Sequence, residues 1–429
     1  MTTLAAPRFR RTAAFRTGLF FAVLALAHLP AQPAADERKR AVDALNDVLE
    51  HFWKGSAVDG HIVLTWRGYA VSRQPQPQYT LWVRGELYAL MYRLYQMTGD
   101  ATLRQRLVAE WKFIKSDCPP AKLQAVGEHS GTNWACDDAG WSAMLYLAAY
   151  QATGDQDALT DAKGVVKNAI TRWMDDQLGG GMWYGDEDHN VDYHSVARSK
   201  SLYQVGLILS ALRIYELTHD KSYLEPAMKC TEWIEGHLRR PDGIYWSNYD
   251  AHGPWGGDRP NDIREAGSVS FLGGNMAMGV IDAALFRITV KDEYRKRALG
   301  VAAAIRASKE VDANGVLVDD RDAWADGTFA MDWASDVLTL PGIAPEDKGL
   351  IQKTAVAVYT KDRTPNGYYG GCWDGPADGP GSVWSRKQSC PQQLMTSANA
   401  VDLIVAEAIA AQDPKREPGP ACKSPRANN

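Results

Sequence analysis

The sequence lacks several features that would point directly to a function. It has no Cys-x-x-Cys pair and no His-Glu-x-x-His motif, so a zinc site is not expected. Its apolar run near the N-terminus, residues 19–27, covers less than half of the roughly 20 residues that a transmembrane helix needs. A stable membrane anchor is therefore not expected either.

Basic residues are outnumbered by acidic ones in the central part of the chain. Of the 429 residues, 36–412 carry 39 Lys and Arg against 50 Asp and Glu, and no basic stripe runs through them. Nucleic acid binding requires clustered positive charge to neutralise phosphates. This composition argues against a nucleic acid partner.

The two ends differ from the rest. Four arginines precede the apolar run, and small residues follow it as far as Ala35, which is the pattern of a signal peptide over residues 1–35. Residues 413–429 are rich in Pro, Asn and charge, and we expect a flexible tail. The sequence therefore predicts a protein secreted to the medium or the periplasm.

Six cysteines in an exported chain permit disulfides. Cys118 with Cys136, and Cys372 with Cys390, are close enough in sequence to close loops, and we expect both pairs to form. Cys230 lies in a helical pattern, where a buried free thiol is expected.

A repeat sets the expected architecture. The segments LYALMYRLYQMTGD, SAMLYLAAYQATGD and LILSALRIYELTHD each run an apolar stripe of helical spacing into a short turn, and IDAALFRITVKDEY is a weaker fourth copy. Each turn is followed by a second helical pattern, as in an antiparallel hairpin.

Twelve helices are expected, and the loops between them alternate between short and long. The expected helices are 37–53, 80–97, 101–115, 137–152, 157–176, 198–217, 221–238, 270–288, 291–308, 329–340, 346–360 and 393–411. The long loops, 116–136, 177–197, 239–269, 309–328 and 361–392, would share one face of a closed ring of hairpins. We therefore predict one all-α domain, an (α/α)6 toroid over residues 36–412, with an open helical solenoid as the alternative.

Asp137 and Asp138 are the sharpest candidates for chemistry. They open an expected helix, where acids also serve as caps and complement the helix dipole. Consecutive helical residues point about 100° apart, so both carboxyls can face a cleft from different directions. Two carboxyls on the order of 5 Å apart suit a retaining glycosidase, with one ionised nucleophile and one acid of raised pKa.

The sequence resembles glycoside hydrolase family 76, which contains endo-α-1,6-mannanases and related cell-wall transglycosidases. The resemblance rests on DDAGW at Asp137–Trp141, AYQATGD at the end of the same helix and LGGGMWY at Leu178–Tyr184, and more weakly on DGTF at Asp326–Phe329 and QLMTSANA at Gln393–Ala400. It implies Asp137 as nucleophile and Asp138 as general acid/base, acting on an α-mannan-type polysaccharide.

Two segments depart from the family pattern. The family usually has Tyr-Asn-Gln-Gly at the start of a later helix, where this chain has Ser270 to Asn275 with the sequence SFLGGN. After DGTF the family tends to have Lys-Gly, and this chain has Ala330-Met331. These departures concern sugar subsites rather than the acid pair.

Aromatic residues and glycines near the long loops are candidate substrate contacts. Aromatic faces stack on pyranose C–H surfaces, and glycine lets backbone approach closely; burial in the core is the competing explanation for each tryptophan. The predicted contacts are Trp134, Trp141, Gly180, Gly181, Trp183, Tyr184, Trp246 and Trp373.

Neither a metal nor a cofactor is expected. Asp186-x-Asp188-x-Asn190 hints at a calcium loop, but Val191 and Ala197 stand where such a loop needs Gly and Glu. Two carboxyls suffice for glycoside hydrolysis. The expected partner is a polysaccharide or oligosaccharide, and the expected state is a monomer.

Three other functions stay open at the level of sequence. The ring could serve a hydrolase or transglycosidase for another sugar, or a sugar epimerase, although export and few loop histidines disfavour the epimerase. It could also be a carbohydrate-binding protein without turnover.

Overall fold

The computed structural model describes most of the central chain. The described residues are 33–63, 80–117, 135–176, 179–185, 199–250, 259–261, 271–318, 328–377 and 390–412. The predicted signal peptide as far as residue 32, the tail 413–429 and most of the long loops lie outside them.

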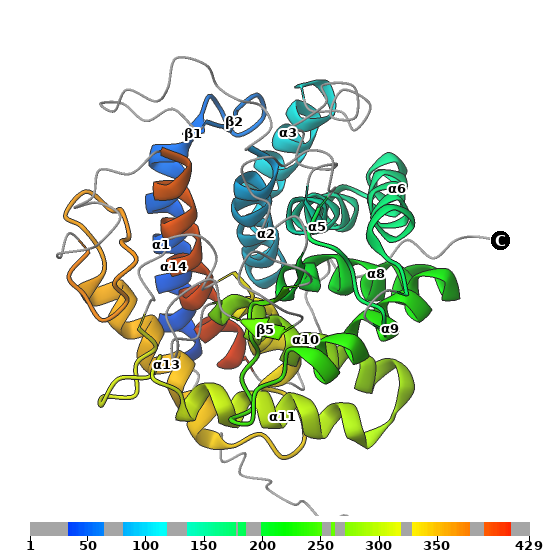
Figure 1. Cartoon of the computed structure of the whole chain (residues 1–429). Helices are drawn as coiled ribbons and strands as arrows, with labels where there is room; N and C mark the ends of the chain where they lie inside the picture. The colour runs from blue at the N-terminus through cyan, green and yellow to red at the C-terminus, as the bar shows by residue number, and fades with distance from the viewer. Residues whose placement is uncertain are drawn as a thin grey trace, which may run out of the picture.

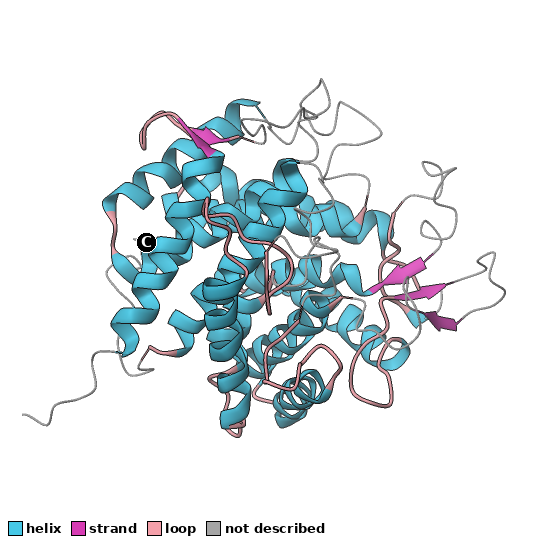
Figure 2. Ribbon diagram, turned by 90° about the vertical axis from the view of Figure 1, so that its left-hand side faces the viewer, coloured by secondary structure: helices cyan, strands magenta, loops and turns pink. Residues whose placement is uncertain are grey.

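The described residues are predominantly helical and form an inner and an outer set (Figures 1 and 2). The inner set is α2 (Thr80–Thr98), α5 (Cys136–Thr153), α8 (Val205–Thr218), α10 (Leu272–Thr289), α12 (Ala330–Asp332) continued by η5 (Trp333–Val337), and α14 (Cys390–Ala410). The outer set is α1 (Pro33–Phe52), α3 (Ala101–Asp117), α6 (Gln156–Trp173), α9 (Lys221–His237), α11 (Asp292–Ala307) and α13 (Pro345–Lys361).

The inner helices close into a ring. Along the ring α2 packs on α5, α5 on α8, α8 on α10, α10 on η5, η5 on α14, and α14 back on α2. The last inner helix, α14, also pairs with the first outer helix, α1, and the two lie side by side in Figure 1. This closure confirms the (α/α)6 toroid and excludes the open solenoid.

The predicted repeat forms one recurring turn at the same end of successive inner helices. Thr98, Thr153, Thr218 and Thr289 each donate a hydrogen bond to the carbonyl four residues earlier, at 2.6 to 2.7 Å. In the first three copies the next Asp accepts the backbone N–H two residues later and caps the outer helix. The short turns therefore lie on one face, and the long loops enter the N-terminal ends of the inner helices on the other.

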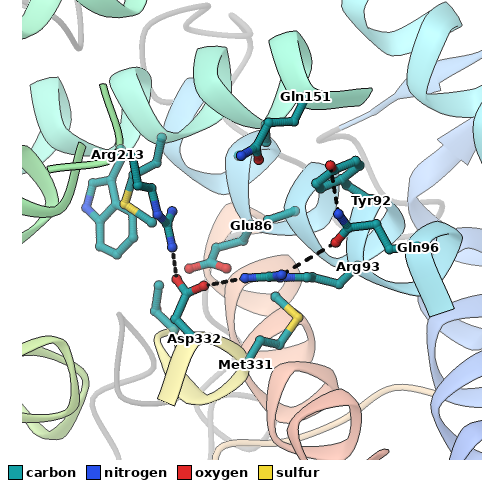
Figure 3. A pocket seen from close by; sticks show the side chains of 14 residues that line it. Glu86, Tyr92, Arg93, Gln96, Gln151, Arg213, Met331 and Asp332 are labelled. Atoms are coloured by element: carbon teal, nitrogen blue, oxygen red, sulfur yellow. Dashed lines mark hydrogen bonds and ion pairs between the residues drawn. The ribbon is translucent and has the colours of Figure 1, made fainter. Parts of the chain in front are cut away.

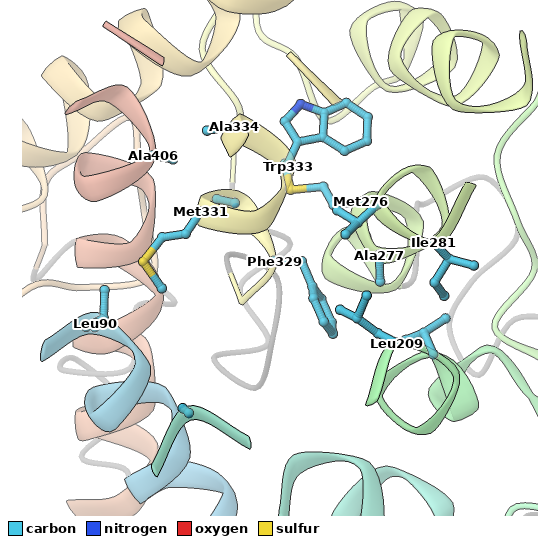
Figure 4. Close-up of a cluster of buried hydrophobic side chains, with 14 of the residues drawn as sticks. Leu90, Leu209, Met276, Ala277, Ile281, Phe329, Met331, Trp333, Ala334 and Ala406 are labelled. Atoms are coloured by element: carbon cyan, nitrogen blue, oxygen red, sulfur yellow. The ribbon is translucent and has the colours of Figure 1, made fainter. Parts of the chain in front are cut away.

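The core fills the space between the inner helices and continues under the outer ones. Inner helices such as α8 and α10 are buried on most sides because they have neighbours in the ring and outside it. The cluster drawn in Figure 4 includes Leu90 of α2, Leu209 of α8, Met276 of α10, and Phe329 and Trp333 at α12 and η5. One core thus joins segments more than 200 residues apart.

The structure differs from the sequence prediction at two inner helices. The expected helix 198–217 begins only at Val205, after strand β3 (Ser199–Ser201) and a 3₁₀ turn, η4 (Leu202–Gln204). Strand β3 pairs antiparallel with β4 (Asn248–Asp250), which pairs with β5 (Arg259–Asn261). The hydrogen bonds of the sheet therefore replace those of a first helical turn, because β3 lies against β4.

The second difference is in the expected helix 329–340, which is one α-turn, α12, followed by a π-helix, η5. The ring of Trp333 lies against Gly279 of α10, where a Cβ would approach it to 2.4 Å. The wider π-turn accommodates this indole between η5 and α10. A smaller pair, β1 (Trp53–Lys54) with β2 (His61–Ile62), follows α1.

The disulfide prediction is wrong for both pairs. Cys136 and Cys372 are buried and take part in no disulfide, whereas the side chains of Cys118 and Cys390 lie outside the described part. Cys136 begins α5 with its side chain in the core, where burial raises the pKa of the thiol well above its usual range. Cys230 is a buried free thiol, as predicted.

None of the described helices combines the length and the apolar character needed to cross a membrane. Likewise, no cluster of three or more potential metal-ligating side chains occurs within the described ranges.

The weak fourth repeat generates a prediction about stability. Val290 ends α10 with φ of 60°, where the first two repeats have Gly99 and Gly154, and its side chain is 77% exposed. A β-branched residue in this left-handed region is strained. We expect Val290→Gly to raise the free energy of unfolding by about 1 kcal/mol, measured by urea unfolding followed by circular dichroism.

A matched control is Val108→Gly, since Val108 is also exposed but lies inside α3. There glycine costs about 0.5–1 kcal/mol through chain entropy. Destabilisation by both substitutions would contradict the strain at Val290.

Candidate active site

Asp137 and Asp138 lie at the N-terminal end of inner helix α5, on the face of the long loops. Both side chains are half-buried. Ala135, the residue before the first residue of α5, has extended backbone and no side chain that could cap the helix. The two carboxyls are thus the polar groups that the chain offers at this helix start.

The two carboxyls have different surroundings. One oxygen of Asp137 accepts a hydrogen bond from the backbone N–H of Asp138 at 2.8 Å, and the other accepts one from the hydroxyl of Tyr184 at 3.2 Å. Within the described part of the chain, no group donates a hydrogen bond to the Asp138 carboxyl. Asp137 therefore partly caps α5, whereas Asp138 does not.

This difference separates the pKa values of the pair. Burial raises the pKa of Asp137 to about 6, and the hydrogen bonds from the Asp138 amide and Tyr184 limit that rise. Burial, and then the negative charge of Asp137, raise the pKa of Asp138 well above its usual range. Asp137 is thus the group of the pair that ionises first.

Close packing around Gly140 explains why the DDAGW motif has a glycine at this position. A Cβ at this position would lie 2.8 Å from the backbone nitrogen of Leu207 and 2.9 Å from the carbonyl carbon of Gly206. Helix α5 therefore packs backbone to backbone against α8, two residues after the acid pair. Trp141 follows and stacks on Phe329 across the ring, with centroids 5.5 Å apart.

The predicted substrate contacts divide into several environments. Tyr184 lies beside Asp137, with its ring edge-on to Tyr203 at 5.9 Å. Trp183 is half-buried, and its indole N–H donates to the Asp175 carboxylate at 2.6 Å. Trp246 is also half-buried, and the Arg240 guanidinium lies over its ring. Trp134 lies outside the described residues, as do Asp186, Asp188 and Asn190 of the hypothetical calcium loop.

Three predicted contacts require correction. Trp373 is 1% exposed and belongs to the core, so it cannot stack on a sugar in this conformation. Gly180 and Gly181 are also buried, and a Cβ on Gly181 would approach the Trp233 ring to 2.6 Å. Their left-handed backbone, with φ of 122° and 76°, serves the path of the loop over that ring.

Asn275, in a segment that departs from the family pattern, has a structural role here. Its side-chain oxygen accepts the backbone N–H of Tyr245 at 2.8 Å, and its amide nitrogen donates to the carbonyl of Phe271 at 3.0 Å. The residue is fully buried. It fixes the loop after α9 to the start of α10.

Sequence reasoning missed a pocket in the axis of the ring (Figure 3). It has a volume of about 120 Å³ and extends from Trp141 and Thr328 to the side chains of Gln96 and Gln151 near the short turns. Arg93 and Arg213 approach Asp332 from opposite sides at 2.7 and 2.6 Å. Acidic residues within apolar inner-helix stripes were the signal available in the sequence.

Burial disfavours the ionised form of two further carboxyls near this axis. Burial raises the pKa of Glu86 to about 8 and that of Asp402 well above its usual range. Asp402 accepts the backbone N–H of Met331 at 2.6 Å. The pKa of Asp332 is also subject to burial, but Arg213 and Arg93 outweigh it and lower the pKa. The axis therefore combines one acid whose pKa is lowered with two whose pKa values are raised.

The comparisons place these observations in a family. The sequence model of glycosyl hydrolase family 76 matches residues 38–415. The chain belongs to glycosyl hydrolase family 76. The protein is accordingly a glycoside hydrolase. A search of the curated proteins found no match.

Solved structures with the same fold are distant in sequence. An α-1,6-mannanase of Salegentibacter sp. HEL1_6, in an inactive variant with two consecutive aspartates replaced by asparagine and bound to α-1,6-mannotriose, is 19% identical over 87% of this chain and 100% of its own, with a TM-score of 0.68. A family 76 mannosidase of Bacteroides thetaiotaomicron is 15% identical over 87% and 99%, with a TM-score of 0.62. Dfg5 from Chaetomium thermophilum, in complex with glucosamine, is 16% identical over 87% and 91%, with a TM-score of 0.61.

The close approach at Gly140 predicts the effect of adding one methyl group. Gly140→Ala places a Cβ against the α8 backbone, so we expect a loss of roughly 1–3 kcal/mol in the free energy of unfolding. Gly164→Ala in α6, which has open space around its Cα, should be neutral or stabilising. Equal urea midpoints for the two variants would contradict the backbone contact.

The raised pKa of Glu86 predicts how stability varies with pH. The unfolded chain ionises this group near its ordinary pKa of 4.5, whereas the fold keeps it protonated to about 8, so its ionisation favours unfolding as pH rises between these values. Glu86→Gln should therefore gain about 1 kcal/mol or more over the wild type from pH 5 to pH 8. Thermal unfolding across this range measures the difference.

The control for this prediction is Glu50→Gln on the exposed side of α1. It removes an exposed carboxyl of the same chemical type and measures the effect of losing one negative charge at the surface. A Glu86→Gln difference that stays constant from pH 5 to pH 8 would contradict the raised pKa of Glu86.

Proposed function

We propose that the protein is a secreted, retaining glycoside hydrolase that cleaves α-1,6-linked mannan, with Asp137 as nucleophile and Asp138 as general acid/base. The observation that carries this proposal is the unequal acid pair at the start of α5. Asp137 has two hydrogen-bond donors and the lower pKa of the two, whereas Asp138 is kept protonated. These are the two states that a retaining mechanism needs at the outset.

The chemistry proceeds in two displacements. In the first, the Asp137 carboxylate attacks the anomeric carbon, the glycosidic C–O bond breaks, and Asp138 gives its proton to the leaving oxygen. In the second, water attacks the same carbon and gives a proton to Asp138, and the bond to Asp137 breaks. Two inversions leave the product with the configuration of the substrate.

The choice of substrate is supported by family membership and by a related fold. The Salegentibacter α-1,6-mannanase is inactive when two consecutive aspartates are replaced, and it was captured with α-1,6-mannotriose. Asp137 and Asp138 are a consecutive pair in this chain. The long loops that would contact the sugar lie largely outside the described residues, so the proposal depends on the pair.

The proposal predicts the behaviour of two single variants. Asp137→Asn and Asp138→Asn should each lower the release of reducing ends from α-1,6-mannan by at least 10³-fold. The first variant lacks the nucleophile, and the second lacks the general acid/base. Circular dichroism should stay helical and unchanged. For the wild type, NMR of the first product should show the α-anomer.

Asp157→Asn is a matched control. Asp157 also lies in the first turn of a helix, but on the face of the short turns, where it pairs with Lys115. Full activity is expected. Wild-type protein that binds mannan without releasing reducing ends would refute the proposed hydrolysis and favour a binding function, and a first product of inverted configuration would refute the retaining mechanism.

A further inference from the structure

Lys200 is buried beneath the loop that carries Tyr184. The side chain is 0% exposed, in the middle of β3. Its ammonium donates to the Asp175 carboxylate at 2.9 Å and to the carbonyl of Gly180 at 2.6 Å, and it lies 4.7 Å from the centre of the Trp183 ring. Burying an ammonium is costly, and these contacts are the compensation.

The same loop is held on both sides of Tyr184. Trp183 forms a backbone bridge with Lys200, and Gly185 forms one with Ala135. The carbonyl of Tyr184 accepts the backbone N–H of Cys136, the first residue of α5, at 2.7 Å. The backbone of Tyr184 is therefore fixed relative to the residue next to Asp137.

The result is a direct contact between loop and acid pair. The Tyr184 hydroxyl donates to Asp137 at 3.2 Å, on the oxygen that the Asp138 amide does not bind. A donor on a carboxylate stabilises its ionised form and restricts its orientation. Both effects favour attack by Asp137 on the anomeric carbon.

We infer that Lys200 is a positioning residue for the proposed reaction: it holds the loop 179–185 so that Tyr184 hydrogen-bonds to Asp137. This inference rests on the proposed function. Lys200 does not reach the reacting atoms and acts through Tyr184. It also explains why Gly180 and Gly181 are buried, since the carbonyl of Gly180 binds Lys200 and Gly181 passes over Trp233.

Among the described residues, different charged and titratable groups influence the pKa values of Asp137 and Lys200. Asp138, Cys136 and Tyr184 face Asp137. Asp175, Cys230 and Lys229 face Lys200. Because Lys200 does not itself face Asp137, a change in the titration of Asp137 on replacing Lys200 would have to pass through the loop.

The test compares Tyr184→Phe, Lys200→Met and the double variant. Both single variants should lower kcat about 10- to 100-fold with a smaller change in KM, and both should move the acidic limb of the pH profile of kcat/KM to higher pH. The double variant should be no worse than the more severe single variant, because both substitutions remove the same contact. The inference would be overturned if the kcat losses of the two single variants multiplied in the double variant. It would also be overturned if the acidic limb of the kcat/KM profile of Lys200→Met stayed at the wild-type pH.

Lys229→Met is the matched control. Lys229 is also beside Gly180, but it is about half exposed and pairs with Asp176. Its replacement should leave kcat and the pH profile unchanged. If Lys200→Met does not fold, Asp175→Asn removes the charged partner of Lys200 instead, and the same shift of the acidic limb is expected; no shift would overturn the inference.

A measurement without substrate separates this inference from the proposed function. In protein carrying ¹³C at aspartate carboxyls, with the signal assigned through Asp137→Asn, the pKa of Asp137 should rise by roughly half a unit or more in Tyr184→Phe and Lys200→Met. If the two variants show this rise but the wild type has no mannanase activity, the hydrolase proposal is refuted and the positioning role is retained. If the wild type is active but the variants show no rise, the positioning role is refuted and the hydrolase proposal is retained.

Discussion

Closure of the inner ring is the constraint on which the structure depends. Helix α14 packs on α2 and on α1, so the last inner helix completes a core that begins with the first two helices. Because the short Thr-x-Asp turns connect inner to outer helices at one end, the N-terminal ends of the inner helices share the opposite face. The connectivity of the helices alone therefore places the acid pair, at the start of α5, on that face.

The ring also determines the electrostatics. Inner helices bury polar groups that they direct toward the axis, and burial disfavours charge unless a partner is present. Asp332 stays ionised because Arg93 and Arg213 meet it, whereas Glu86 and Asp402 hold protons. At the loop face the same rule separates Asp137, which has two donors, from Asp138, which has only a charged neighbour. One physical effect thus produces a network of ion pairs in the axis and unequal pKa values in the acid pair at the loop face.

Periodicity and turn chemistry were sufficient to predict most of the fold. The helix pairs, the Thr turns and the ring follow from local patterns that tertiary packing reinforces. Strand β3 and the π-turn at Trp333 could not be predicted, because each depends on a partner distant in sequence: strand β4 and Gly279 of α10, respectively. The disulfide prediction failed for a similar reason, since spacing says nothing about which way a Cys side chain points.

The candidate site shows the same division. Asp137 and Asp138 could be found because the motif places them at a helix start, but which of them has hydrogen-bond donors depends on a loop almost 50 residues away. Trp183, Gly180 and Gly181 were noticed as a motif and interpreted as sugar contacts. In the fold their atoms contact Lys200 or pass over Trp233, in the same loop that carries Tyr184. A motif of glycines and aromatic residues beside a candidate site can therefore owe its composition to packing within the loop.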